Sequence, residues 1–491
     1  MSETSASKGV LHLTISKIFF ILSGYCIIYA LTRILGPEGF GIYSTISAFI
    51  VVLNTIILFG SIQSVSKFVS EDKNNAETIK NKALKAELIT GIIISSSYYL
   101  CAPLIAVFLK DNTLTPLIEV SSVILLCYSV YGVYSGYING KKEFSKQASI
   151  EIIFSVLKAL LIISAAYISY KYFYSGINNI IYPFNMCVYS SLTGFSIAIL
   201  ICIIILFIIT RSKTKENKEF SIKKLLYFQG YIIIFTLLIT LLLQTDLILV
   251  KKFTDDYLTG IYSAALQLCR VPYQIITGVI FVIFPLISEV TFKNEREKTK
   301  TYINNTLRYT LIIVGLIVIL FASSSEGTVL LLYTKKYIES AGILSIYMFN
   351  ILFFCLLLII STIISASGRP LLSCGVIFIT LLISITLNYY GIPIYGIKGA
   401  AIFTTMATFT GLILSIIVLI NKFKCFIKIK SLLKIVLALI LIYLISILIP
   451  ATSSLYVIAK FIILSIMYFR ILCMLKEITI EDINRIKNIK N

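Results

Sequence analysis

The 491-residue chain contains a single histidine and no tryptophan. With His12 as the only imidazole, a metal site built from histidines and a histidine general base are both nearly excluded. None of the 10 cysteines forms a C-x-x-C pair, and nearly all of them lie inside apolar runs, as small buried side chains do. We therefore expect no metal and no cofactor.

Charged residues are also scarce, at 13% of the chain, whereas 58% of residues are hydrophobic and the mean hydropathy is +0.95. Such an excess of apolar residues, gathered in blocks long enough to cross a bilayer, predicts an all-α polytopic membrane protein. The net charge is +20. Because the basic residues lie in short loops, this charge indicates membrane topology and contact with membrane lipids, and no motif supports binding to nucleic acid.

Fourteen apolar blocks are long enough to span the membrane. They lie near residues 10–35, 38–66, 86–109, 116–138, 147–170, 185–210, 222–248, 257–290, 302–322, 340–364, 370–390, 397–420, 431–449 and 453–475.

The distribution of basic residues supports this number of spans. If both termini are cytoplasmic, 31 of the 43 Lys and Arg residues fall on the inside, 8 fall outside and 4 lie within spans. A wrong span count would disturb this alternation, because cytoplasmic loops carry the excess of Lys and Arg. The sequence thus predicts a multi-pass protein of the plasma (inner) membrane with both termini in the cytoplasm.

Part of the sequence recurs about half a chain length later. Gly41-Ile42-Tyr43-Ser44 returns as Gly260-Ile261-Tyr262-Ser263, Ser70-Glu71 returns as Ser288-Glu289, and Asn139-Gly140-Lys141 corresponds to Ser367-Gly368-Arg369. Because six spans separate the copies, the halves have the same orientation and are expected to be related by a pseudo-twofold axis along the membrane normal. This predicts a six-helix N-lobe (1–220), a six-helix C-lobe (221–421) and two further helices in 422–491.

At these residues the chain resembles the polysaccharide-exporter branch of the multidrug/oligosaccharidyl-lipid/polysaccharide exporter superfamily, the O-antigen-type oligosaccharide flippases. The resembling segments are LTRILGPEGFGIYS, SVSKFVSE, SGYINGKKEF, TDLILVKKFTDDYLTGIYSAA, VIFPLISEVTF, ISASGRP and IYGIKGAAIFTT. The resemblance implies an alternating-access transporter, not an enzyme. Such a transporter moves a polyprenyl-diphosphate-linked oligosaccharide from the inner to the outer leaflet for cell-surface polysaccharide or lipopolysaccharide synthesis, and its partners include a glycan polymerase and other assembly proteins.

Basic residues inside spans are candidates for binding an anionic headgroup, because each costs about 2.5–3.5 kcal/mol at the membrane centre. Arg270 and Lys158 lie near the middle of their spans, and Arg33 lies at the outer mouth of the first. We expect Arg270 to face a cleft between the lobes. Lys158 could do the same or pair with a group such as Glu151, and Arg33 could guide a diphosphate or anchor lipid headgroups. Two basic residues nearer to span ends, Arg308 and Lys460, suit snorkelling.

Five further residues are candidates for coupling or gating. Asp246 and Gln244, near the outer end of the seventh span, could bind a coupling cation, although pairing of Asp246 with Lys251 is the favoured alternative. Pro272 could form a hinge, because proline removes a backbone donor. Turns at Gly140 and Gly368 could gate the inner face or could simply be tight basic loops.

Two other classes of protein remain as alternatives. A membrane glycan polymerase or ligase would need catalytic groups outside, but the longest outside loops, about 170–184 and 323–339, hold neither a paired carboxylate nor a histidine. A cation-coupled multidrug exporter of the same superfamily would need acidic groups at the substrate, whereas the charges predicted at mid-membrane are basic. The sequence favours the flippase.

Overall fold

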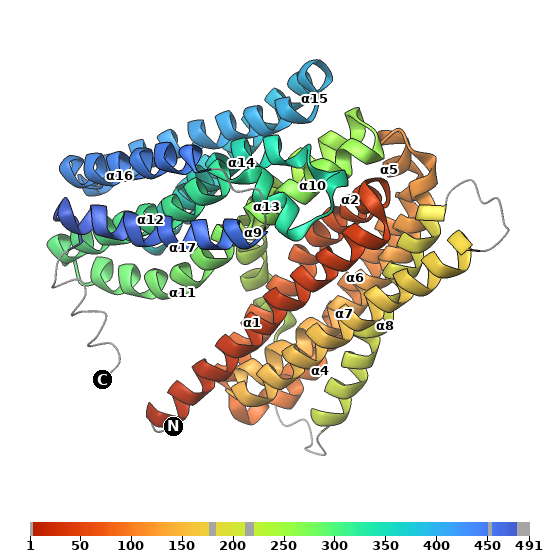
Figure 1. Cartoon of the computed structure of the whole chain (residues 1–491). Coiled ribbons are helices and arrows are strands. Elements are labelled where there is room, and N and C mark those ends of the chain that lie inside the picture. The colour runs from red at the N-terminus through yellow and green to blue at the C-terminus, as the bar shows by residue number, and fades with distance from the viewer. Residues whose placement is uncertain (1–2, 176–182, 212–219, 450–453, 479–491) are drawn as a thin grey trace. The chain divides into compact units, whose positions relative to one another are not determined.

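The structure, a computed structural model, describes residues 3–175, 183–211, 220–449 and 454–478. These residues form helices joined by short turns, and no strand is found among them, which confirms the all-α prediction (Figure 1). The chain divides into two compact units, Met1–Gly260 and Ile261–Asn491. The boundary lies inside helix α10, so the seventh span belongs to the first compact unit, while the division into lobes at residue 220 stays a prediction from the repeat.

The first unit contains nine helices, three one-turn segments and the start of a tenth helix within its described residues. They are α1 (Glu3–Ile34), α2 (Gly36–Asn54), η1 (Thr55–Phe59), α3 (Gly60–Glu71), η2 (Lys73–Asn75), α4 (Ala76–Leu100), α5 (Ala102–Phe108), η3 (Asn112–Leu114), α6 (Thr115–Gly140), α7 (Phe144–Ser175), α8 (Pro183–Ile209), α9 (Ile222–Phe253) and α10 (Asp256–Cys269). Helix α7 packs along both α1 and α8, and α6 contacts α3, α4 and α8.

The second unit continues from α10. Its helices are α11 (Val271–Phe292), α12 (Arg296–Ser323), α13 (Ser325–Leu332), η4 (Lys335–Tyr337), α14 (Ser340–Ala366), α15 (Pro370–Phe423), α16 (Ile429–Leu448) and α17 (Ser454–Met474). Helix α14 is the most enclosed of these, because it packs against α11, α12 and α15. Its apolar residues account for much of the buried core of this unit.

The helices confirm the fourteen expected spans. Twelve helices of the described chain are long and apolar enough to cross a membrane. Helices α4 and α5 form one more span, bent by 50° at Cys101. The 54-residue α15 contains two of the expected spans, because its backbone breaks at Gly396, where φ is +61° and a residue with a side chain would be strained. The chain is thus a multi-pass membrane protein.

Glycines allow helices of the first unit to approach closely. Gly132, Gly136 and Gly140 recur every four residues on α6 and face the segment formed by η1 and α3. A Cβ atom at Gly136 would lie 2.8 Å from the Ile62 carbonyl oxygen, and one at Gly140 would lie 2.7 Å from the Ser66 carbonyl oxygen. Small residues at this spacing bring helix backbones together where lipid supplies no hydrophobic driving force.

Two basic residues of the second unit are held by specific partners. Arg308 on α12 donates from Nε to the Glu477 carboxylate at 2.7 Å, and Ser431 on α16 also donates to Glu477. Lys460 on α17 donates to the Ile449 carbonyl oxygen at 2.8 Å. Arg308 and Lys460 are therefore held by hydrogen bonds that tie the last helices together, and their snorkelling stays a prediction.

Candidate functional site

The repeated glycines lie against each other in the first unit. Gly41, on α2, and Gly260, on α10, approach so closely that a Cβ on Gly41 would overlap the Asp256 carbonyl oxygen and lie 2.8 Å from the Gly260 nitrogen. Likewise, a Cβ on Gly260 would overlap the Pro37 carbonyl oxygen. The tetrapeptides that reveal the repeat thus form a backbone contact between α2 and the start of α10, at the end of the unit that the topology predicts to be outside.

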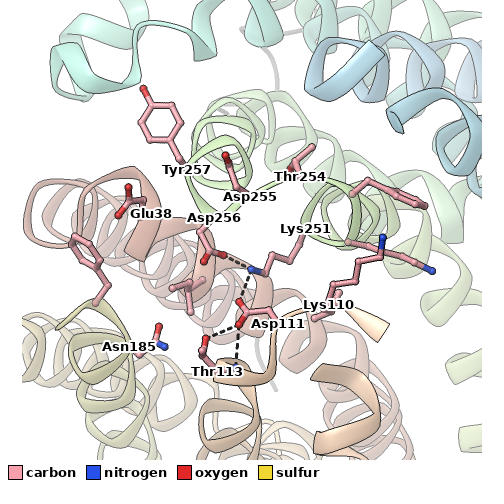
Figure 2. A pocket seen from close by; sticks show the side chains of 15 residues that line it. Glu38, Lys110, Asp111, Thr113, Asn185, Lys251, Thr254, Asp255, Asp256 and Tyr257 are labelled. Carbon is pink, nitrogen blue, oxygen red and sulfur yellow. Dashed lines mark hydrogen bonds and ion pairs between the residues drawn. The ribbon is translucent and has the colours of Figure 1, made fainter. Parts of the chain in front are cut away.

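Next to this contact, a buried lysine joins three elements. Lys251 near the end of α9 is 4% exposed, and its Nζ donates to Asp111 Oδ2 at 2.7 Å and also to Asp256 at the start of α10 (Figure 2). Asp111 follows α5, and its Oδ1 accepts hydrogen bonds from the backbone and side chain of Thr113. We call Lys251, Asp111 and Asp256 the outer ion cluster.

The two carboxyls of the outer ion cluster differ in pKa. Burial would raise the pKa of Asp111, but the hydrogen bonds from Lys251 and Thr113 outweigh this effect and hold it below its usual value. At Asp256 burial dominates over the attraction of Lys251 and raises the pKa. Asp111 is therefore the principal anionic partner of the buried ammonium.

The outer ion cluster lies at the edge of a cavity of about 730 Å³ (Figure 2). Its lining mixes acidic and basic groups with a few aromatic rings: Glu38, Lys110, Lys252, Asp255, Asn185, Phe184, Phe253 and Tyr257 are among them. The cavity lies wholly within the first unit. Its mixed charge suits a polar surface facing water more than a pocket for a purely apolar ligand.

Asp246 and Gln244 are buried in α9, the helix that also carries Lys251. Their side chains are 1% and 5% exposed, and Asp246 Oδ1 accepts a hydrogen bond from the Leu247 backbone nitrogen at 2.8 Å. Lys251 is engaged by Asp111 and Asp256, and the pairing of Asp246 with Lys251 stays a prediction. A coupling-ion role for Asp246 and Gln244 stays a prediction.

Lys158 lies within α7 and is half-buried. Its ammonium lies over the Phe195 ring of α8, 4.2 Å from the centroid. Glu151, one partner that the sequence allowed, is instead bound by Lys17 at 3.2 Å and by Ser16 at 2.8 Å. Among the described residues, no carboxylate lies within ion-pair distance of Lys158.

Arg33 is exposed in the last turn of α1. Its guanidinium stacks on Tyr29, 3.4 Å from the ring centroid, and Nη1 donates to the Tyr29 carbonyl oxygen at 3.2 Å. Arg33 is thus fixed in orientation by its own helix, and both roles considered for it stay predictions.

Arg270 lies in the second unit, at the residue between α10 and α11. It is half-buried, and the buried Pro272 occupies the first turn of α11. Backbone hydrogen bonds continue across the junction, from the Arg270 nitrogen to Leu266 O at 3.1 Å and from the Gln274 nitrogen to Arg270 O at 3.2 Å. The two helices thus join at Arg270, two residues before Pro272, and whether Pro272 acts as a hinge stays a prediction.

The two glycine turns proposed as gates have different local structures. Gly140 ends α6 and serves close packing against α3, whereas Gly368 has a φ of +84° and no neighbour within 4 Å of a Cβ position. Both turns are anchored: Asn139 Oδ1 accepts from Ser66 at 2.6 Å, and the Ser367 carbonyl accepts from Lys422 at 3.2 Å. These contacts are those of tight loops, and a gating role stays a prediction.

Sequence reasoning missed the outer ion cluster as a unit. Lys251 and Asp256 both stand in the resembling segment TDLILVKKFTDDYLTG, but Asp111 is 140 residues from Lys251. The signal that could have found the cluster is the crowding of opposite charges into loops predicted to lie on one side of the membrane. Partner choice among those charges depends on the tertiary contact that brings the turn after α5 to the end of α9.

Comparison with known proteins places this geometry in a wider context. A family model described as "Polysaccharide biosynthesis protein" matches residues 30–342. The chain is 25% identical over 430 residues to the capsular polysaccharide biosynthesis protein CapF of Staphylococcus aureus, covering 83% of this chain and 97% of CapF. It is 23% identical over 395 residues to the uncharacterized membrane protein YabM of Bacillus subtilis (strain 168), covering 76% of this chain and 72% of YabM.

Solved structures show the same fold. A structure of the lipid II flippase MurJ in an inward closed conformation has a TM-score of 0.75 and 17% identity, and covers 94% of this chain and 98% of MurJ. An inward-facing multidrug resistance MATE family transporter of the MOP superfamily has a TM-score of 0.65 and 13% identity, covering 85% of this chain and 99% of the transporter.

Proposed function

The chain belongs to the polysaccharide biosynthesis protein family, and from this membership we propose that it is a flippase for a polyprenyl-diphosphate-linked oligosaccharide. It moves the lipid from the inner to the outer leaflet of the plasma membrane by alternating access, as a step in cell-surface polysaccharide synthesis. It has no catalytic role of its own. Its partners are the lipid-linked glycan, membrane lipids, and the polymerase and assembly proteins that act on the glycan.

The observation that carries the proposal is Lys158. It is a basic residue within the apolar span α7, and the carboxylate nearest to it along the helix, Glu151, is bound by Lys17 and Ser16. A basic side chain at this depth is costly unless it meets an anion or faces water. A diphosphate headgroup supplies such an anion. Arg270 supplies a second basic group in the second unit, in a geometry that can bind two phosphate oxygens at once.

The contact of α2 with α10 supports alternating access. The backbones of Gly41 and Gly260 touch, and the outer ion cluster lies beside them. A transporter that releases its substrate outside must separate such a contact in part of its cycle. The charged groups of the outer ion cluster suit this role. When the contact opens, water can replace their ion-pair partners, whereas apolar side chains would gain no such partner from water.

Transport of the lipid itself is the test. The full-length protein is reconstituted into vesicles containing a polyprenyl-diphosphate oligosaccharide, and an impermeant glycosidase is added outside. We expect the protein to make the protected inner-leaflet glycan accessible. Lys158→Met should slow this step by at least about tenfold, the loss that corresponds to about 1.4 kcal/mol of binding. Lys171→Met is the matched control, because Lys171 is an exposed lysine of the same helix.

The same vesicles separate the flippase from its alternative. The MATE-like fold is shared by multidrug transporters, so a cation-coupled drug exporter stays the second candidate. Efflux of cationic drugs with no movement of the glycan lipid would replace the proposed function by this one. Formation of new glycosidic bonds by the purified protein would instead indicate a polymerase or ligase.

A further inference from the structure

Glu87 is a buried carboxyl group that the proposed transport mechanism leaves unused. It lies in α4, where its side chain is 1% exposed, although the sequence places it at the very start of the third span. Thr90, one turn later, donates to its Oε2 at 3.3 Å. The other oxygen, Oε1, is buried and has no hydrogen-bond partner among the described residues.

The group facing Glu87 is an amide on another element. Gln229 of α9 is 5% exposed, and its side chain lies beside the Glu87 carboxyl. Gln229 lies across Gly60 at the start of α3, and a Cβ at Gly60 would be 2.5 Å from Gln229 Cγ. Because Gly60 has no side chain, the Gln229 side chain can occupy this space. Gln229 Oε1 is also buried without a partner.

No basic residue in the part of the chain that the structure describes forms an ion pair with Glu87. Three lysines of α3 and α4 have other partners. Lys67 lies over the Phe228 ring, 3.9 Å from its centroid. Lys80 binds Glu77 and the Thr210 carbonyl oxygen, and Lys82 binds the Phe220 carbonyl oxygen. Lys73, Lys85, Lys223 and Lys224 are exposed, and on α6 the neutral Ser129 packs against this part of α4 at Gly91. None of the ten ion pairs found in the described chain includes Glu87.

The chemistry of the pair identifies the missing ligand. An ionised carboxylate removed from water without a cation costs several kcal/mol, whereas the neutral acid carries its own O–H donor. Glu87 and Gln229 together present two buried oxygens that only accept hydrogen bonds. One proton converts a carboxyl oxygen into a donor and needs no additional space. A metal ion would need more oxygen ligands than this pair offers.

We propose that Glu87 is a proton-binding site, and that the contact of α4 with α9 closes with Glu87 protonated. In the repeat, α4 belongs to the predicted first lobe and α9 opens the predicted second, so separation of the two helices would admit water and allow the acid to ionise. Closing and opening of this contact then takes up and releases one proton. The proton site itself does not depend on which substrate the protein carries.

Infrared difference spectra of the full-length protein test the protonation state directly. At neutral pH, the spectrum of the wild type minus that of Glu87→Gln should show the C=O band of a carboxylic acid. Glu77→Gln is the matched control on the same helix: Glu77 binds Lys80 at 2.6 Å and Lys141 at 3.5 Å, so its difference spectrum should show ionised carboxylate bands. Carboxylate bands for Glu87, or bands that appear only with sodium, would overturn the proposal.

Stability gives a second readout. Gln resembles the neutral acid in shape, so Glu87→Gln should fold and melt at the wild-type temperature or above it at neutral pH. As the pH rises, ionisation opposes burial of Glu87 in the folded wild type, so its melting temperature should fall relative to that of Glu87→Gln. Equal pH dependence of the two proteins would contradict the proposal. Neither measurement needs a transported lipid, so failure here is distinct from failure of the proposed flippase activity.

Discussion

Arg270 lies at the junction of α10 and α11, inside the apolar segment predicted as the eighth span. It lies about 20 Å from the start of that span, counted at 1.5 Å per residue, which is too deep for comfortable snorkelling. The repeat places Val51 at the equivalent position of α2. A charge present in one copy and absent from the other is better suited to a substrate than to a shared scaffold.

We therefore expect Arg270→Ala to fold and insert but to lose glycan export by at least about tenfold, since a hydrogen bond to a charged group contributes about 1.5–3 kcal/mol. Arg270→Lys should retain part of the activity, because the charge remains while the forked donor geometry is lost. Arg296→Ala, at an exposed arginine of the same unit, serves as the control. Export is measured together with the amount of folded protein. Wild-type export by a stably expressed Arg270→Ala variant would contradict the assignment.

The sequence could place basic residues within spans but could not choose their partners. Arg308 is an example: its position predicts snorkelling but does not predict its partner Glu477, which is 169 residues away. Glu87 is another, because an acidic residue near the end of an apolar block normally faces water, whereas the packing of neighbouring helices buries it here. Spacing along a chain gives depth in the membrane, whereas burial and pairing depend on which helices meet.

At the scale of helices, the contact between α2 and α10 has little room for side chains. A Cβ on Gly41 would overlap a backbone oxygen of α10, and backbone cannot move aside as a flexible side chain can. Gly41→Ala should therefore force α2 and α10 apart, at a cost of about 1–3 kcal/mol typical of overpacking. We expect a lower melting temperature and increased labelling of a cysteine placed at Thr259, which is fully buried in the wild type.

The control for this prediction is Gly278→Ala on α11, where a Cβ would have no neighbour within 4 Å. It should change neither the melting temperature nor the labelling of Cys at position 259. If Gly41→Ala behaved like this control, the close contact would not hold α2 against α10.

The helices themselves were largely predictable, and the exceptions have local causes. Apolar blocks gave the spans, and the break at Arg270 follows from Pro272, which fits only the first turn of a helix. The merging of two expected spans into α15 was not predictable. Helical geometry runs up to Gly396 and resumes directly after it, so that Gly396 is the one non-helical residue between the two spans. The bend between α4 and α5 lies at Cys101, just before Pro103 in the first turn of α5.

At the scale of the whole molecule, the repeat and the compact units divide the chain differently. The repeat separates the chain near residue 220, whereas α9 and the first turns of α10 pack with the first unit up to Gly260. The two divisions are compatible if the first helices of the second repeat are held by contacts that a transport cycle can release. The outer ion cluster and the Glu87–Gln229 pair each include one residue of α9, Lys251 and Gln229, which lie toward opposite ends of that helix.

The orientation of the whole molecule gives the last prediction. The 31-to-8 distribution of basic residues places the loops at Asn74 and Asn294, and the segment at Lys215, in the cytoplasm, and those at Asn112 and Asp255 outside. Asn74, Asn294, Asn112 and Asp255 are exposed, and Lys215 lies outside the described residues.

Single cysteines are introduced at these positions after the native cysteines are removed, and intact cells are treated with an impermeant thiol reagent. Positions 112 and 255 should react, whereas 74, 215 and 294 should react only after lysis. Because an even number of spans separates the two copies of the repeat, positions 74 and 294 must behave alike. Labelling of one but not the other would mean that the halves are inverted and that the span count between them is odd.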